Sequence, residues 1–147
     1  MIKLQFEIVP TACWYNNLRN VLSKRAWDFI RKDAYSRANG KCMICNRSVK
    51  RLEAHEKWEY VEETHTQKLV DVIAICHLCH SVIHIGRTQL LGKEDIAIKH
   101  FKYVNKCDYQ GYITALKKAN EENVRLSKID DWTLDLSWLK RFTKKDN

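Results

Sequence analysis

Cys76-His77-Leu78-Cys79-His80-Ser81-Val82-Ile83-His84 is the stretch of this 147-residue chain that constrains its fold most strongly. A matching pair, Cys42-Met43-Ile44-Cys45, lies upstream, with thirty residues between the two pairs. That separation is long enough for a β-hairpin that folds the second pair back onto the first. Four thiolates can then surround one tetrahedral Zn²⁺ at about 2.3 Å. We therefore expect a zinc site formed by Cys42, Cys45, Cys76 and Cys79.

The expected zinc site takes all four of its ligands from the protein. A closed site has no position for a substrate, so its metal stabilises the fold. Two redox-active dithiols are the other interpretation of the same spacing. Cys13 and Cys107 lie outside the pattern and are predicted to be small apolar packing residues.

The hydrophobic pattern predicts an α+β fold with helices on both sides of the zinc core. Pro10 ends an alternating strand, Asn39-Gly40 ends a helix whose Trp27 and Ile30 face the core, and Gly86 closes the helix that carries the histidines. The expected elements are a strand over 2–9, helices over 15–22 and 24–38, two strands within 51–75, helices over 77–85, 93–105 and 109–126, and an apolar-rich tail of undetermined type over 132–142.

The length suits one globular core, so we expect a single domain over residues 1–147. It comprises an N-terminal strand and basic helices (1–40), a zinc and metal core (41–86) and a helical C-terminal extension (87–147). No apolar stretch is long enough to cross a bilayer, and the first residues lack the apolar segment of a signal peptide. We expect a soluble, cytoplasmic protein with no membrane partner, and leave its oligomeric state open.

The formal net charge of +8 favours a polyanionic partner. The charge is uneven, because residues 51–92 carry four Lys or Arg against six acids, whereas residues 1–50 carry ten against three. A basic surface beside an acidic, histidine-rich segment suits a protein that holds a phosphate backbone in one place and a cation in another. The expected backbone contacts are Lys24, Arg25, Arg31, Lys32, Arg37 and Arg87.

Three histidines are candidate ligands for a second metal. His80 and His84 lie four residues apart on the expected helix, so they project from one face. His55 follows Leu52-Glu53-Ala54 on the first strand of the expected hairpin. An isolated pair at this spacing is usually a surface coincidence, but this pair directly follows a zinc knuckle that would fix the start of its helix. Three imidazoles suit Zn²⁺, Ni²⁺, Co²⁺ or Mn²⁺ better than Mg²⁺.

Together these features resemble the HNH, or ββα-metal, endonucleases. The matching segments are the helix before Asn39-Gly40-Lys41-Cys42-Met43-Ile44-Cys45, the strand Leu52-Glu53-Ala54-His55, and Cys76-x-x-Cys79-His80-x-x-x-His84. The likeness covers about residues 25–86. It implies a treble-clef-like ββα-metal core whose three histidines hold a catalytic metal. It also implies a metal-dependent endonuclease that hydrolyses DNA, with RNA not excluded, of a kind common in phages and mobile elements.

Two positions depart from the family pattern. The family's general-base His directly follows the strand ligand, and Glu56 occupies that place; the family's central Asn falls on Asp71. We expect Glu56 to take the proton from water and Asp71 to hold the hairpin loop through local backbone hydrogen bonds. A shifted register would make His55 the base, but it would put Ala54 in the ligand position and lose a metal contact.

Other interpretations remain open at this stage. Glu56 could be a solvent-facing strand residue, and the chain could be a catalytically silent HNH fold that binds nucleic acid or protein. A purely structural zinc-ribbon adaptor would leave the histidines unexplained. A zinc protease is excluded, because His55-Glu56-Lys57-Trp58 is followed by Glu59 rather than His. His65 is loop-borne and could approach the metal site, although a surface position is preferred.

Overall fold

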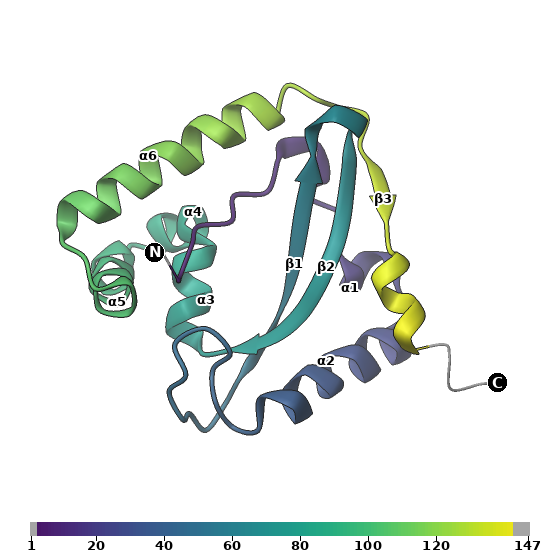
Figure 1. The fold of residues 1–147 in the computed structure, drawn as a ribbon, viewed down its shortest axis with the longest axis horizontal. Coiled ribbons are helices and arrows are strands. Elements are labelled where there is room, and N and C mark those ends of the chain that lie inside the picture. The colour runs from purple at the N-terminus through teal and green to yellow at the C-terminus, as the bar shows by residue number, and fades with distance from the viewer. Residues whose placement is uncertain (1–2, 143–147) are drawn as a thin grey trace.

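A long antiparallel hairpin organises the computed structural model, which describes residues 3–142 (Figure 1). The fold is mixed α+β, with a three-stranded sheet and several helices. The elements are η1 Thr11–Cys13, α1 Leu18–Val21, α2 Lys24–Ala38, β1 Glu53–Val61, η2 Glu62–Thr64, β2 Thr66–Ile75, α3 His77–Ile83, α4 Ile85–Leu90, α5 Glu94–Asn105, α6 Tyr109–Leu126, β3 Thr133–Asp135 and η3 Ser137–Phe142.

The hairpin gives the sheet two differently covered faces. β1 pairs antiparallel with β2 and β3 pairs parallel with β2, so the strand order is β1-β2-β3 and β1 forms one edge of the sheet within residues 3–142. The register pairs His55 with Ile73 and Glu56 with Val72. Because successive side chains on a strand point to opposite faces, His55 and Glu56 face different halves of the molecule.

Each face of the hairpin covers its own core. On the face of His55, Ile73 and Ile75 pack with residues of α3, α5 and α6. On the other face, Val72 and Ala74 pack against α2, whose bounds match the prediction. The expected stripe on that helix is buried: Trp27, Ile30, Ala34 and Ala38. α2 ends at Asn39, which adopts φ 52° as expected of a left-handed cap.

The predicted N-terminal strand is wrong for residues 3–9. This segment joins no sheet, although its backbone is fastened elsewhere. Leu4 is fully buried, and Glu7 N–H donates to the carbonyl of Ile83 at 3.0 Å. Alternating apolar residues favour any extended segment with one buried side, but a strand also needs a ladder of hydrogen bonds to a neighbouring strand, and this segment bonds to Asn105 and Ile83 instead. The rest of that prediction, residues 1–2, lies outside the described part of the chain.

Gly86 does not close the histidine helix. α3 ends at Ile83, His84 breaks the helix with φ −96° and ψ 56°, and Gly86 lies inside α4. The expected helix over 15–22 is shorter, beginning after Asn17, whose side chain accepts from Asn20 N–H. The tail of undetermined type becomes β3 and η3, while α5 and α6 lie where the sequence predicts. No helix in the described residues is both long and apolar enough to span a membrane.

Candidate metal centres

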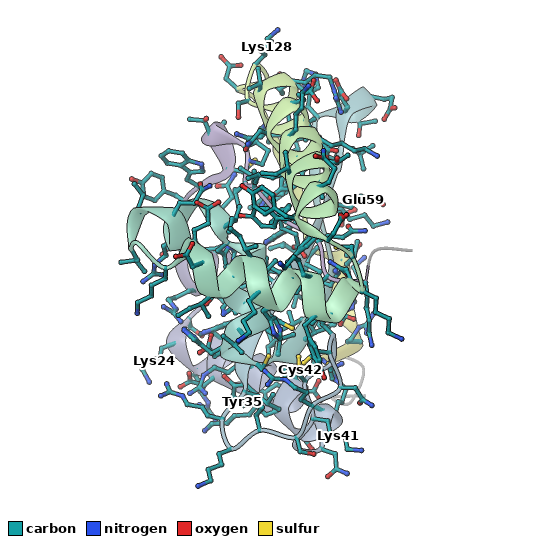
Figure 2. All side chains as sticks on the ribbon, turned by 90° about the vertical axis from the view of Figure 1, so that its left-hand side faces the viewer. Lys24, Tyr35, Lys41, Cys42, Glu59 and Lys128 are labelled. Carbon is teal, nitrogen blue, oxygen red and sulfur yellow. The ribbon has the colours of Figure 1, made fainter. Side chains whose placement is uncertain are left out.

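The four cysteines form a cluster with the dimensions of a tetrahedral site. Their sulfur atoms all lie within 4.8 Å of one another, and those of Cys45 and Cys76 are 3.8 Å apart. Figure 2 labels Cys42 of this cluster. A tetrahedron with arms of 2.3 Å has edges of about 3.8 Å. All six cysteines, each within residues 3–142, are free thiols, so no disulfide competes for these sulfurs. The two knuckles thus meet as the sequence predicts, at metal-binding distance.

The thiols of this cluster cannot all ionise without a cation. Hydrogen bonds from Cys76 and Cys79 hold the pKa of Cys42 far below its usual value. The same contacts raise the pKa of the Cys79 thiol, because a second thiolate would lie against the first. A coordinated metal removes this conflict by deprotonating its thiol ligands. Two further side chains face the sulfurs: Arg47 donates to Cys76 Sγ at 3.6 Å, and His100 Nε2 lies 3.2 Å from Cys79 Sγ.

The three predicted histidines also come together. His55 projects from β1, while His80 lies in α3 and His84 at its end. One nitrogen from each lies within 4.8 Å of the other two. The ring centroids are 5.4 Å apart for both His55 pairs and 4.8 Å apart for His80 and His84. Cys76 is the N-cap of α3, so the knuckle sets the position of the two helix histidines. Three imidazole nitrogens in this arrangement fit a borderline divalent cation.

The helix histidines are neutral at physiological pH. Burial, followed by the charges of His55 and His80, lowers the pKa of His84 to about 4. Burial likewise lowers the pKa of His80, and the hydrogen bond to Glu53 only partly offsets this effect. An imidazole must be neutral to offer its lone pair to a metal, so this environment keeps both rings ready to coordinate.

Two glutamates that the sequence analysis missed contact the histidine cluster. Glu53 places Oε1 2.7 Å from His80 Nδ1, and Glu7 places Oε1 2.9 Å from His55 Nε2. Burial raises the pKa of each carboxyl, but the histidine contacts outweigh it, and both pKa values fall below their usual range. Glu53 could have been found, because Glu53 and His55 share a strand face at period two. Nothing in the sequence links Glu7 to a strand 48 residues away.

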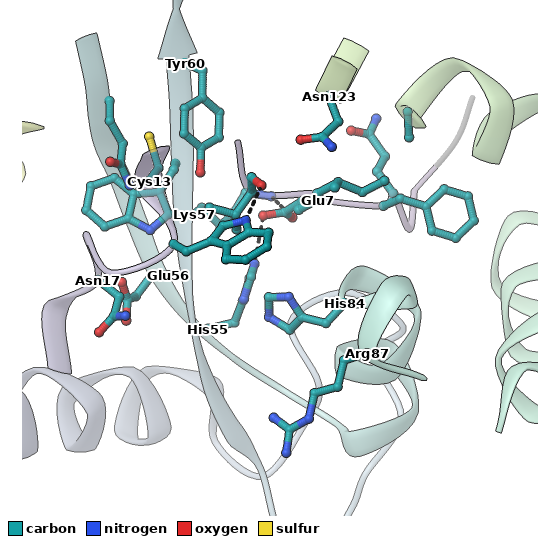
Figure 3. A pocket seen from close by; sticks show the side chains of 18 of the residues that line it. Glu7, Cys13, Asn17, His55, Glu56, Lys57, Tyr60, His84, Arg87 and Asn123 are labelled. Carbon is teal, nitrogen blue, oxygen red and sulfur yellow. Dashed lines mark hydrogen bonds and ion pairs between the residues drawn. The ribbon is translucent and has the colours of Figure 1, made fainter. Parts of the chain in front are cut away.

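The predicted role of Glu56 does not fit its position. Its side chain leaves β1 on the face opposite His55, toward Asn17 and away from His84 (Figure 3). Glu56 Oε1 accepts the backbone N–H of Leu18 at 3.0 Å, at the start of α1. Burial raises the pKa of Glu56 above its usual value. The alternation of strand side chains therefore removes this carboxylate from the histidine cluster and gives it a structural contact.

Asp71 also differs from its prediction. It lies within β2 rather than in the hairpin loop, opposite Lys57 and next to a bulge, where the pairing skips Val70. Its Oδ1 accepts the N–H of Val72 at 2.8 Å and lies 4.0 Å from Arg37. The expected local backbone hydrogen bond therefore exists, but it stabilises the bulge.

His65 lies at the far end of the hairpin from the histidine cluster. It adopts φ 52° after η2, and its Nδ1 contacts Asp131 Oδ1 at 2.8 Å. The seven residues from His55 to Val61 span about 20 Å of strand. His65 therefore does not approach the cluster.

Only one of the predicted phosphate contacts lies beside the histidines. Arg87, on α4, lines the same pocket of about 790 Å³ as His55 and His84 (Figure 3). The basic residues of α2 lie on the other face of the hairpin: Lys24, Arg25, Arg31, Lys32 and Arg37.

Some of the α2 charges are already paired. Lys24 and Arg31 both contact Asp28, at 3.2 and 3.0 Å, and Arg37 contacts Asp33 at 2.8 Å. Arg37 also donates to the carbonyl of Val72 at 2.6 Å. The structure therefore separates the predicted basic surface from the histidine cluster by the thickness of the hairpin.

No protein-family model, curated protein or solved structure matches this chain. The site therefore rests on its own geometry, a mixed α+β fold with a cysteine cluster and a histidine cluster, each at metal-binding distance.

Proposed function

We propose that the protein is a metal-dependent endonuclease of the HNH type that hydrolyses phosphodiester bonds in DNA. The observation that carries the proposal is the meeting of His55, His80 and His84 at one face of the hairpin, directly after a thiolate knuckle. In this proposal β1, β2 and α3 form a ββα-metal, treble-clef-like core, and the four cysteines hold structural Zn²⁺.

The histidine set fits a catalytic rather than a structural metal. Three protein ligands leave at least one coordination position open, unlike the closed thiolate site. A divalent metal bound there would act as a Lewis acid toward a phosphate oxygen. Arg87, exposed at the same pocket, is placed to contact phosphate charge. Glu56 is not assigned the base, because its carboxylate lies on the other face of β1.

A silent binding module is the second candidate function. It is favoured by one observation, that Glu56 and Asp71, which occupy two family motif positions, both serve backbone contacts. Such a module would keep the fold and lose the chemistry. A chain that cuts nothing but still binds nucleic acid or protein would match it.

Incubation of the zinc-loaded protein with supercoiled plasmid and Mn²⁺, Ni²⁺, Co²⁺, Zn²⁺ or Mg²⁺ tests the proposal. We expect nicking by the parent and by His65→Ala, a control that removes a histidine remote from the cluster. We expect His80→Ala to be inactive while retaining its thiolate zinc. If the parent cuts neither DNA nor RNA with any of these metals, the nuclease proposal is wrong and the binding module replaces it.

A further inference from the structure

The N-terminal segment of residues 3–10 is fastened to the C-terminal extension. Asn105, the last residue of α5, accepts the N–H groups of Lys3 and Leu4 through Oδ1, each at 2.8 Å. Its Nδ2 donates to the carbonyl of Leu4 at 2.9 Å. One side chain thus reproduces the pairing that a neighbouring strand would have supplied, and this fixes the segment across more than a hundred residues of sequence.

Three further contacts fix the direction of this segment at Glu7. The ring of Phe6 stacks on Phe101 of α5, with centroids 5.0 Å apart, and packs edge-on against Tyr112 of α6 at 5.5 Å. The next residue donates its N–H to Ile83, the final residue of α3 and the neighbour of His84. Phe6 therefore faces the helical extension, while Glu7 is held against the end of the histidine helix.

The Glu7 carboxylate lies between a histidine and a lysine of β1. Oε1 is 2.9 Å from His55 Nε2, and Oε2 is 3.6 Å from Lys57 Nζ (Figure 3). His55 is only 4% exposed, so its ring has little freedom to turn. An ionised carboxylate can only accept, so Nε2 carries the proton. This tautomer leaves the lone pair of His55 on Nδ1.

The same arrangement occurs a second time in the cluster. His80 meets Glu53 through Nδ1, which leaves its Nε2 lone pair available. A divalent metal on three neutral imidazoles carries two positive charges in a half-buried place. Glu7 and Glu53 are two negative charges, each one imidazole away. Carboxylates in this position orient ligating histidines and raise their basicity.

We propose that Glu7 is a positioning residue of the histidine metal centre, which sets the tautomer and orientation of His55 as a ligand. The N-terminal segment and α5 are therefore parts of that centre, because they deliver Glu7 to it. The inference rests on the proposed function, since it requires a second metal at His55, His80 and His84.

Titration of the zinc-loaded full chain with Co²⁺, monitored by calorimetry and by visible absorption, tests this role. We expect Glu7→Ala to raise the Kd for Co²⁺ by about 10- to 100-fold, the usual cost of removing such a partner, and to shift the Co²⁺ absorption bands. Glu7→Gln keeps an acceptor oxygen but loses the charge, so it should fall between Ala and the parent. Glu59→Gln, at an exposed position on β1, is the matched control and should bind Co²⁺ like the parent.

A variant of Asn105, which fastens the N-terminal segment, separates the positioning of His55 from the general stability of the fold. Asn105→Ala should raise the Kd for Co²⁺ less than Glu7→Ala, because the packing of Phe6 still holds the segment. Its melting temperature without Co²⁺ should nevertheless fall further, since it loses three backbone contacts. If Glu7→Ala binds Co²⁺ as tightly as the parent with an unchanged spectrum, the inference is wrong and the histidine site stands. With the thiolate site filled by zinc, His80→Ala should bind no Co²⁺. If the zinc-loaded parent also binds no Co²⁺, the inference and the proposed function are both wrong.

Discussion

The cysteine and histidine clusters share α3, but their surroundings carry opposite charge. The guanidinium of Arg47 faces the sulfurs, whereas the carboxylates of Glu7 and Glu53 face the imidazoles. Four thiolates around Zn²⁺ leave two negative charges, and three imidazoles around a divalent ion leave two positive ones. Each cluster is therefore surrounded by groups that offset the charge its metal complex would have. With both metals bound, the proposal gives one closed anionic centre and one open cationic centre on the same helix.

The strongest test of this comparison removes a thiolate. Cys79→Ser opens a site that holds both knuckles and the start of α3, so it should lose zinc and several kcal/mol of folding free energy, on the order of half the stability of a small domain. Zinc analysis and thermal unfolding measure both effects. The corresponding variant of the histidine cluster, His80→Ala, should keep its zinc and most of its stability. Full zinc content in Cys79→Ser at an unchanged melting temperature would contradict the structural role of this cluster.

Acid should affect the histidine cluster in a defined pH window. The pKa of His84 is about 4 in the fold, below the usual 6.5, so the unfolded chain binds the proton more readily between these values. The stability from neutral His84 is complete above pH 6.5 and is lost as pH falls toward 4, on the order of 3 kcal/mol. Urea unfolding of the zinc form without a second metal, at pH 7 and pH 5, should show about 2 kcal/mol of this loss. In His84→Gln the loss should be smaller, and equal losses in both proteins would assign the effect to other groups.

Glu56→Gln tests whether the Glu56 carboxylate belongs to the histidine centre. The glutamine retains an oxygen for the N–H of Leu18, so we expect a stability loss of about 1 kcal/mol and nearly unchanged cleavage of plasmid. The family pattern would instead place a general base here, whose loss typically costs about 100- to 10,000-fold in rate. A loss of cleavage on that scale, with second-metal binding intact, would return Glu56 to the site.

The smallest expected effect concerns the two faces of the hairpin. Arg87→Gln removes one charge beside the histidines and should lower the salt dependence of DNA binding by about one unit of slope. Arg31→Gln together with Lys32→Gln tests the face of α2, where the sequence analysis expects a reduction of about one to two units. Fluorescence anisotropy between low and physiological salt measures both. If the α2 double variant lowers the salt dependence and Arg87→Gln does not, the DNA backbone lies away from the histidines.

Part of the site could be predicted because its rules are local. Ser23 caps α2 through Ala26 N–H and Asn39 ends it, and both signals lie within one turn of the helix. The i,i+4 spacing places His80 and His84 on one face whatever the rest of the chain does. The opposite orientation of Glu56 also follows from strand alternation alone, whereas its predicted role as general base rests on the family's motif order.

The sequence by itself determined the helix and hairpin periods, the two cysteine knuckles and the shared face of the helix histidines, because spacing and capping act over a few residues. Only the tertiary structure decided that Glu7 meets His55, that Asp71 lies beside a bulge and that the basic helix lies across the hairpin from the histidines. These outcomes depend on which segment covers which face of the sheet. That choice reflects burial summed over the whole chain, such as Leu4 and Phe6 packing into the core of the C-terminal helices.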